Sequence, residues 1–247
     1  MVLLRYSTPY DWPMISGWLR ARAIEGVERV EEDAYVRGGV VVRHDADRQG
    51  VWCAPPARLQ ATRLFDLGAD PHAIRKTFSR DPLLAPRIRK RPGVRVPGAW
   101  DPFELAVRAI VGQQVSVAAA RTILGRIAAS PGIVPERLAE VSIEGMPRKR
   151  AETIRLLARW VLDCGGIAAA FESGGDAAAL QKIPGIGPWT ANYIAMRLGD
   201  RDAFPAGDLI LRRMAGNLTE RELLRHAEAW RPFRAYGAML LWTTTAT

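Results

Sequence analysis

The stretch KIPGIGPWTANYIAM, residues 182–196, decides the fold of the second half of this chain. Two prolines and two glycines fall within Pro184–Pro188, and an amphipathic helical pattern resumes directly after them. Gly185 and Gly187 permit positive φ and leave no side chain over the backbone. Pro188 suits the first turn of a helix, where its missing N–H costs nothing. The pattern predicts a helix, a tight hairpin and a second helix.

This hairpin has two interpretations. Bare N–H groups at the N-terminus of the second helix would suit one phosphate group. A plain antiparallel turn uses the same glycines and prolines, so the pattern alone leaves both interpretations open. We expect Asp176 to cap the first helix and the second helix to extend to Leu198. The expected inner faces are Leu180 and Ile183 in the first helix, and Ala191, Ile194, Ala195 and Leu198 in the second.

The composition is that of a globular chain without a membrane span. Its 247 residues, 48% of them hydrophobic, suffice for one large domain or two smaller ones. No apolar run approaches the ~20 residues that cross a bilayer, and the N-terminal MVLLRYSTPYDW lacks a signal-peptide pattern. Cys53 and Cys164 have no CxxC or CxxH companion, which argues against a disulfide framework, a structural zinc and a four-cysteine iron–sulfur cluster. We therefore expect a reducing, cytoplasmic location.

The charge balance favours an anionic partner without proving one. Lys and Arg number 35 against 26 Asp and Glu, which gives a net charge of +9. Most of these cations are arginines, and a guanidinium grips phosphate through two parallel hydrogen bonds. A GC-rich gene also enriches arginine, so charge alone fits a nucleic-acid-binding protein and an ordinary basic enzyme equally well.

The N-terminal part of the chain mixes helix and strand signals. A helix is predicted over Asp11–Ile24, where apolar residues recur at helical spacing. Strands are predicted over Tyr35–His44 and Gly50–Ala54, where valine, tyrosine and tryptophan cluster.

From Ala57 onward the strand signal disappears and helix signals follow one another to the end. Arg87–Gly98 is basic and broken by proline and glycine, so we expect the chain to cross between domains there. The predicted class is α+β and mostly helical. A mixed α/β domain is expected over residues 1–86 and a helical core over 87–247.

Helix signals in the second part are well punctuated. Asp101, Pro102 and Glu104 supply a cap, a first-turn proline and a glutamate three residues after the cap. The helix that starts there is interrupted at Gly112–Gln114. Further helices are predicted from a Ser116 cap, over Pro147–Cys164, from a capping box of Thr219 with Glu222, and over Phe233–Trp242.

Several blocks of this sequence resemble one enzyme family. Pro184–Tyr193 followed by Phe204–Asp208 resembles the hairpin, the Gly/Pro-rich loop and the catalytic aspartate of the helix-hairpin-helix DNA glycosylase superfamily. The similarity is greater to its bacterial 3-methyladenine DNA glycosylase II branch. The resemblance implies a helical core of two lobes with the active-site cleft between them. The other matching blocks, in the expected order, are Thr8–Trp12, Arg20–Ala23, Val96–Gly98, Val107–Val117 and Gly145–Glu152.

The resemblance implies that Asp208 is the catalytic residue. Breaking the bond between a base and C1′ leaves positive charge on the deoxyribose, as an oxocarbenium ion. A carboxylate beside the sugar stabilises that charge and can accept a proton from the attacking water. Asp208 also stands where it could cap the helix that follows. The two roles are compatible.

Trp189 decides the expected subclass. In bifunctional relatives a lysine follows the hairpin and attacks C1′, whereas this sequence has Trp189 at the matching place, and an indole is no nucleophile. The resemblance therefore implies a monofunctional enzyme that leaves an intact abasic site. Two alternatives stay open: a glycosylase-lyase that uses another lysine such as Lys182, and a non-enzymatic DNA-binding protein that keeps only the hairpin.

The resemblance also implies a pocket for a base turned out of the duplex. Trp18, Trp189, Tyr193 and Trp242 match its lining positions, although each alone is also an ordinary core residue. Trp189 and Tyr193, four residues apart, share a helix face. Alkylation at N3 or N7 makes a purine cationic, so it binds an aromatic face and leaves without a strong general acid. We expect alkylated purines to be the substrates.

Two positions depart from the family pattern. Gln114 stands where an apolar wedge commonly fills the gap left by the flipped base, and it could still intercalate or hydrogen-bond there. Leu209 stands where an aromatic residue often follows the catalytic aspartate. The DNA-binding hairpin implied by the resemblance comprises Pro184, Gly185, Ile186, Gly187 and Thr190.

We expect no cofactor, apart from a monovalent cation that hairpins of this type can hold with backbone carbonyl groups. His44, His72 and His226 are scattered, so no metal site built from side chains is predicted. The expected partner is double-stranded DNA with alkylated bases. We expect a monomer without membrane contact, located at the bacterial nucleoid.

Overall fold

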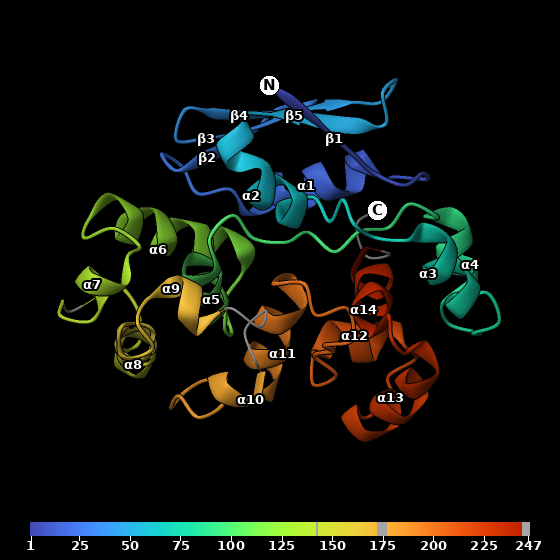
Figure 1. Cartoon of the computed structure of the whole chain (residues 1–247). Coiled ribbons are helices and arrows are strands. Elements are labelled where there is room, and N and C mark those ends of the chain that lie inside the picture. The colour runs from blue at the N-terminus through green and yellow to red at the C-terminus, as the bar shows by residue number, and fades with distance from the viewer. Residues whose placement is uncertain (142, 172–176, 244–247) are drawn as a thin grey trace.

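The computed structural model describes residues 1–141, 143–171 and 177–243. Figure 1 shows a sheet with two short helices beneath it and, below these, two groups of helices on either side of the molecule. This architecture confirms the predicted α+β, mostly helical class. Asp176, the predicted cap of the first hairpin helix, lies outside the described residues.

The sheet is antiparallel, and its order is β1-β5-β4-β3-β2. A single strand over Tyr35–His44 was a wrong prediction. Gly38 and Gly39, both at positive φ, turn the chain there, so Val36 pairs with Val41 across a hairpin. Strand β2 also went unpredicted because three residues are too few to show an alternating pattern. The strands are β1 (Val2–Arg5), β2 (Glu28–Val30), β3 (Ala34–Arg37), β4 (Val40–Asp45) and β5 (Gly50–Cys53).

Helix α1 (Trp12–Arg22) joins the sheet to the rest of the molecule. The helix predicted over Asp11–Ile24 is confirmed, and Asp11 is its cap, with a side chain that accepts the N–H of Met14. Trp12, Ile15 and Leu19 of α1 are buried in one cluster with residues of the sheet and of α2 (Arg58–Leu64). Trp18 of the same helix packs against a different core, the one that contains residues of α14.

The predicted crossover at Arg87–Gly98 was wrong in its first four residues. Those residues complete α4 (Ala85–Lys90), where the burial of Ile88 outweighs the proline and charge signals. One helical lobe contains α5 (Pro102–Val111), α6 (Val117–Ala129), α7 (Pro135–Leu138), α8 (Arg148–Asp163) and α9 (Ile167–Ala170). The other contains α3 (Pro71–Phe78), α4, α12 (Leu209–Met214), α13 (Glu220–Ala227) and α14 (Arg234–Trp242). Short 3-10 helices precede α2, at Pro55–Ala57, and connect α13 to α14, at Glu228–Trp230.

The two hairpin helices are α10 (Ala177–Leu180) and α11 (Pro188–Arg197), and α11 is shared between the lobes. Ala191 and Ile194 belong to the core of the α5–α9 lobe, whereas Ala195 and Met196 belong to the core of the other lobe. Tyr193 packs against both cores. The hairpin helix therefore lies where the lobes meet, and Figure 1 shows it at the centre of the molecule.

Buried ion pairs connect the sheet to α5. Arg37 of β3 contacts Glu104 at 2.7 Å, and Arg108 contacts Glu28 at 2.7 Å and Glu104 at 2.6 Å. These four side chains are only 8–18% exposed, so each charge depends on the others for compensation. The domain boundary at residue 87 stays a prediction.

Asp66 gives the protein a pH-dependent stability. Burial raises the pKa of its carboxyl to about 6, against the opposing hydrogen bonds from Val96 N–H and the Tyr236 hydroxyl. Because the folded-state pKa lies above the ordinary 3.8, the charged form destabilises the folded state as pH rises toward 6.

We expect Asp66→Asn to raise the free energy of unfolding at pH 8 by up to about 3 kcal/mol and to change it little at pH 3.5. Asparagine tolerates the positive φ of 47° at this position. Urea unfolding of both proteins at the two pH values measures the difference. A variant less stable than its parent at pH 8 would contradict the assignment.

Candidate active site

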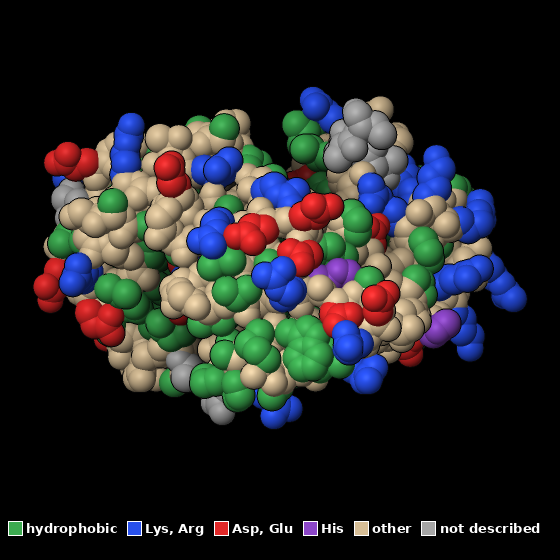
Figure 2. Space-filling view, turned by 90° about the horizontal axis from the view of Figure 1, so that it is seen from above, with side chains coloured by type: hydrophobic (Ala, Val, Ile, Leu, Met, Phe, Trp, Pro, Cys, Tyr) green, Lys and Arg blue, Asp and Glu red, His purple; other side chains and the backbone are tan. Residues whose placement is uncertain are grey.

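A cavity of about 380 Å³ lies where α1, α5, α6, α11 and the end of α14 meet. Seen from above, the molecule is hollowed between the two lobes (Figure 2). Asp208 and all four predicted aromatic residues line the cavity. The structure therefore brings together residues that are up to 224 positions apart in the sequence, from Trp18 to Trp242.

The Asp208 carboxylate is surrounded by N–H donors. As the cap of α12, its Oδ1 accepts the backbone N–H groups of Ile210 and Leu211, both at 2.9 Å. Trp242 Nε1 donates to the same oxygen at 3.1 Å, and Trp189 Nε1 donates to Oδ2 at 2.9 Å. The capping and cavity-lining roles of this residue therefore coexist.

The predicted aromatic residues form two neighbouring pairs. Trp189 and Tyr193 stack at 5.4 Å with an angle of 10° between their rings, as their spacing on α11 suggests. Trp18 and Trp242 lie 5.8 Å apart, and Tyr193 meets Trp242 edge-on at 6.1 Å. All four are only partly buried, so ring surface remains open to the cavity.

The predicted hairpin lies between α10 and α11. Gly185 has φ +92°, and the exposed Gly187 is the residue before α11, where it has no side chain that could cap the helix. The N–H groups of the first turn of α11 therefore lack partners within the helix. Ile186 is instead buried in the core of the α5–α9 lobe, and so anchors the hairpin, while Pro184 is exposed.

Thr190 and Gln113 connect the hairpin to the end of α5. Gln113 Nε2 donates to Gly185 O at 3.2 Å and to the buried Thr190 Oγ1 at 2.9 Å. A phosphate contact by Thr190 would therefore use its backbone N–H. Sequence reasoning missed Gln113, although the break at Gly112–Gln114 marked the segment.

Gln114, the wedge candidate, is exposed beside this connection. Its φ of +57° is uncommon for a residue other than glycine, and such strain is concentrated at functional sites. Gln114 is not among the residues that line the cavity. This placement outside the pocket is compatible with a wedge.

Two arginines of the cavity were not predicted as site residues. The Arg22 guanidinium lies 3.6 Å from the centre of the Trp18 ring, and Arg197 donates to the Tyr193 hydroxyl at 2.7 Å. Burial would raise the pKa of Tyr193, but the charges of Arg197 and Arg22 outweigh it and lower that pKa. Both arginines follow an aromatic residue at i+4, a spacing that could have revealed them.

Side chains that could bind a metal are dispersed. Within the described ranges, no three His, Cys, Asp or Glu residues gather into a metal site. His44 stacks on Trp12, His226 contacts Asp81, and His72 is exposed. Of the helices in the described part of the chain, none is both long and apolar enough to span a membrane.

The structure is similar along its whole length to the 3-methyladenine DNA-glycosylase from Archaeoglobus fulgidus. The TM-score is 0.81 at 18% identity, with 100% of this chain and 98% of the other covered. Two helical lobes that share a glycine-rich hairpin helix give the chain the helix-hairpin-helix glycosylase fold.

Sequence comparison gives the family. Residues 1–101 match the AlkA N-terminal domain. The chain is 34% identical to DNA-3-methyladenine glycosylase 2 of Escherichia coli over 99% of this chain and 97% of that protein. It therefore belongs to the AlkA family of DNA-3-methyladenine glycosylase 2.

The chain is also similar to a protein that is about twice as long. The probable bifunctional transcriptional activator/DNA repair enzyme AlkA of Mycobacterium tuberculosis is 37% identical over 96% of this chain. The chain covers 55% of that protein, and so spans about half the length of this relative.

Proposed function

We propose that this protein is a monofunctional DNA glycosylase that flips alkylated purines of the 3-methyladenine type out of duplex DNA. It hydrolyses the N-glycosidic bond and leaves an abasic site for base excision repair. The observation that carries the proposal is the Asp208 carboxylate, directed into an aromatic cavity by four N–H groups. The family of the chain, named for 3-methyladenine, supports the same substrate class.

The geometry suggests that the aromatic side chains bind the base and that Asp208 acts on the sugar. A cationic purine stacks among the rings of Trp18, Trp189, Tyr193 and Trp242, which favour positive charge on their faces. As the bond to C1′ breaks, the oxocarbenium ion faces Asp208, which is already oriented and needs no rearrangement to stabilise it. The same carboxylate can accept a proton from the water that attacks C1′.

The monofunctional part of the proposal rests on Trp189. Its indole occupies the place of the lyase lysine and is hydrogen-bonded to Asp208. Lys182, the lysine of the alternative mechanism, is exposed and is not among the cavity-lining residues. Borohydride trapping of a covalent protein–DNA adduct would support the alternative.

Duplex DNA is the proposed partner of the hairpin. Arg75, Lys76, Arg80, Arg89 and Lys90 are exposed on and near α3 and α4, the side on which Lys and Arg gather in Figure 2. Binding should weaken with salt at a log–log slope of ~0.9 per phosphate contacted. We further propose a cytoplasmic, nucleoid-associated monomer and a monovalent cation held by hairpin carbonyl groups.

One assay tests the proposed function. Duplex DNA methylated with dimethyl sulfate is incubated with the protein, and the released bases are identified by chromatography. We expect 3-methyladenine in the supernatant and strand breaks only after alkali treatment. Release of uracil or 8-oxoguanine without any 3-methyladenine would refute the substrate class, and breaks before alkali would refute the monofunctional mechanism.

A further inference from the structure

Arg22, at the C-terminal end of α1, brings an uncompensated charge into the cavity. Its guanidinium covers one face of Trp18, donates a long hydrogen bond of 3.4 Å to the Trp18 carbonyl, and also interacts with the Tyr193 hydroxyl. Among the described residues, no carboxylate pairs with it, although four acidic side chains line the same cavity. Glu28 and Glu104 are engaged by Arg37 and Arg108 instead.

The part of the cavity around Arg22 contains donors rather than acceptors. Trp18 Nε1 is buried and has no hydrogen-bond partner. The Tyr193 hydroxyl oxygen faces the guanidinium groups of Arg197 and Arg22, which can only donate, so the hydroxyl proton can point to another acceptor. Buried donors are almost always satisfied in a working complex, so these groups call for acceptor atoms on the ligand.

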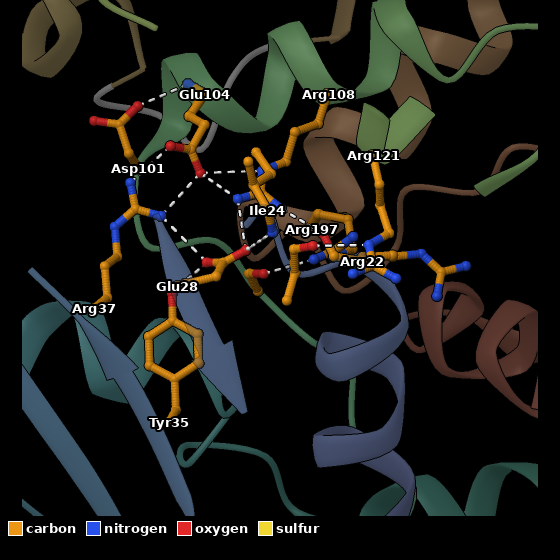
Figure 3. A network of polar contacts seen from close by, with 12 residues as sticks. Arg22, Ile24, Glu28, Tyr35, Arg37, Asp101, Glu104, Arg108, Arg121 and Arg197 are labelled. Carbon is orange, nitrogen blue, oxygen red and sulfur yellow. Dashed lines mark hydrogen bonds and ion pairs between the residues drawn. The ribbon is translucent and has the colours of Figure 1, made fainter. Parts of the chain in front are cut away.

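The backbone around Arg22 is fixed by the interface between the sheet and the helical core (Figure 3). Arg108 donates to the Arg22 carbonyl at 2.9 Å, and Arg121 Nε donates to the Ala23 carbonyl at 2.9 Å. Glu28 Oε1 accepts the N–H of Ile24 at 3.3 Å. The segment after α1 is thus held from α5, α6 and β2, while the Arg22 side chain remains directed into the cavity.

We propose that Arg22 reads the acceptor edge of the flipped base and favours purines that carry a carbonyl oxygen at position 6 over those that carry an amino group. This inference rests on the proposed function and adds a specificity residue to it. 7-Methylguanine and 3-methyladenine are both cationic in DNA, so repulsion from Arg22 acts on both. Only the guanine derivative offers O6 to the guanidinium, whereas the amino group of the adenine derivative brings donors toward donors.

The two bases can be compared within one DNA molecule. Dimethyl sulfate produces both in the same duplex, and chromatography of one supernatant gives both initial rates. We expect Arg22→Gln to lower the ratio of 7-methylguanine to 3-methyladenine release by about 10-fold, because a charge-assisted hydrogen bond is lost. Arg22→Lys keeps the charge but not the fork of N–H groups, so a fall of about threefold is expected.

Arg20→Gln is the matched control on the same helix. Arg20 is exposed, donates to the carbonyls of Val30 and Glu31, and does not line the cavity. Its ratio should equal that of the parent. A merely structural role for Arg22 would slow release of both bases equally, and an unchanged or increased ratio in Arg22→Gln would overturn the inference. If the parent releases neither base, the proposed function itself fails, and the inference falls with it.

Discussion

Asp208→Asn is expected to slow base release from methylated duplex DNA by at least about 100–1,000-fold. The amide carries no charge to meet the oxocarbenium ion, and it is too weak a base to accept a proton from water. Single-turnover release under saturating protein measures the effect. Duplex affinity should stay within about twofold of the parent, because the hairpin and the exposed cations are unchanged.

The fold should tolerate this substitution. Asparagine caps a helix as well as aspartate does, so the bonds from Ile210 and Leu211 N–H can persist. Its NH₂ group would face Trp189 Nε1–H in place of an acceptor, at a cost of about 1 kcal/mol in stability. An asparagine variant as active as its parent would end the enzyme interpretation.

Trp242→Phe tests whether catalysis needs the Asp208 carboxylate to be held in its orientation as well as to be charged. Phenylalanine keeps an aromatic ring but removes the donor to Oδ1, one of three bonds that this oxygen accepts. We expect a fall of about 10-fold in release, intermediate between the parent and Asp208→Asn. If the parent itself binds duplex DNA but releases no base, the protein is a binding module that keeps only the hairpin.

Local signals in the sequence were sufficient for most of the helical core. The caps at Asp101, Ser116 and Thr219 are formed by the predicted side chains, since an N-cap depends only on residues within one turn. The sheet was harder. The run from Tyr35 to His44 has strand propensity throughout, and only the pair Gly38–Gly39 marks the hairpin inside it.

The site shows the same division between local and long-range information. Asp208 and the hairpin lie in motifs that read along the chain, whereas the cavity depends on contacts between distant segments. Arg108 reaches the carbonyl of Arg22 across 86 positions, and Gln113 reaches Gly185 across 72. No pattern within a helix specifies such pairs. The orientation of Arg22 could therefore not be predicted from the sequence.

Gly185→Ala is expected to disrupt the hairpin, and Gly187→Ala is its matched partner. A Cβ at residue 185 would lie 1.9 Å from Thr153 Oγ1, at a φ of +92° that alanine rarely adopts. We expect this variant to lose about 2–4 kcal/mol of unfolding free energy, from backbone strain and overpacking together. At residue 187 a Cβ would meet no atom within 4 Å, and φ is −85°, so stability should change by less than about 0.5 kcal/mol.

DNA affinity then shows whether Gly187 leaves room for a phosphate or only shapes the turn. If a phosphate approaches the bare backbone of the hairpin, the Gly187→Ala variant keeps its stability but binds duplex DNA about 10-fold more weakly, because the methyl group holds the phosphate away from the N–H donors. Combining Gly185→Ala with Thr153→Ala should recover the packing part of the stability loss and leave the strain from φ. Should Gly187→Ala bind as tightly as the parent, the glycines would only shape a turn between helices, and the cations around the cleft would have to hold the DNA without the hairpin.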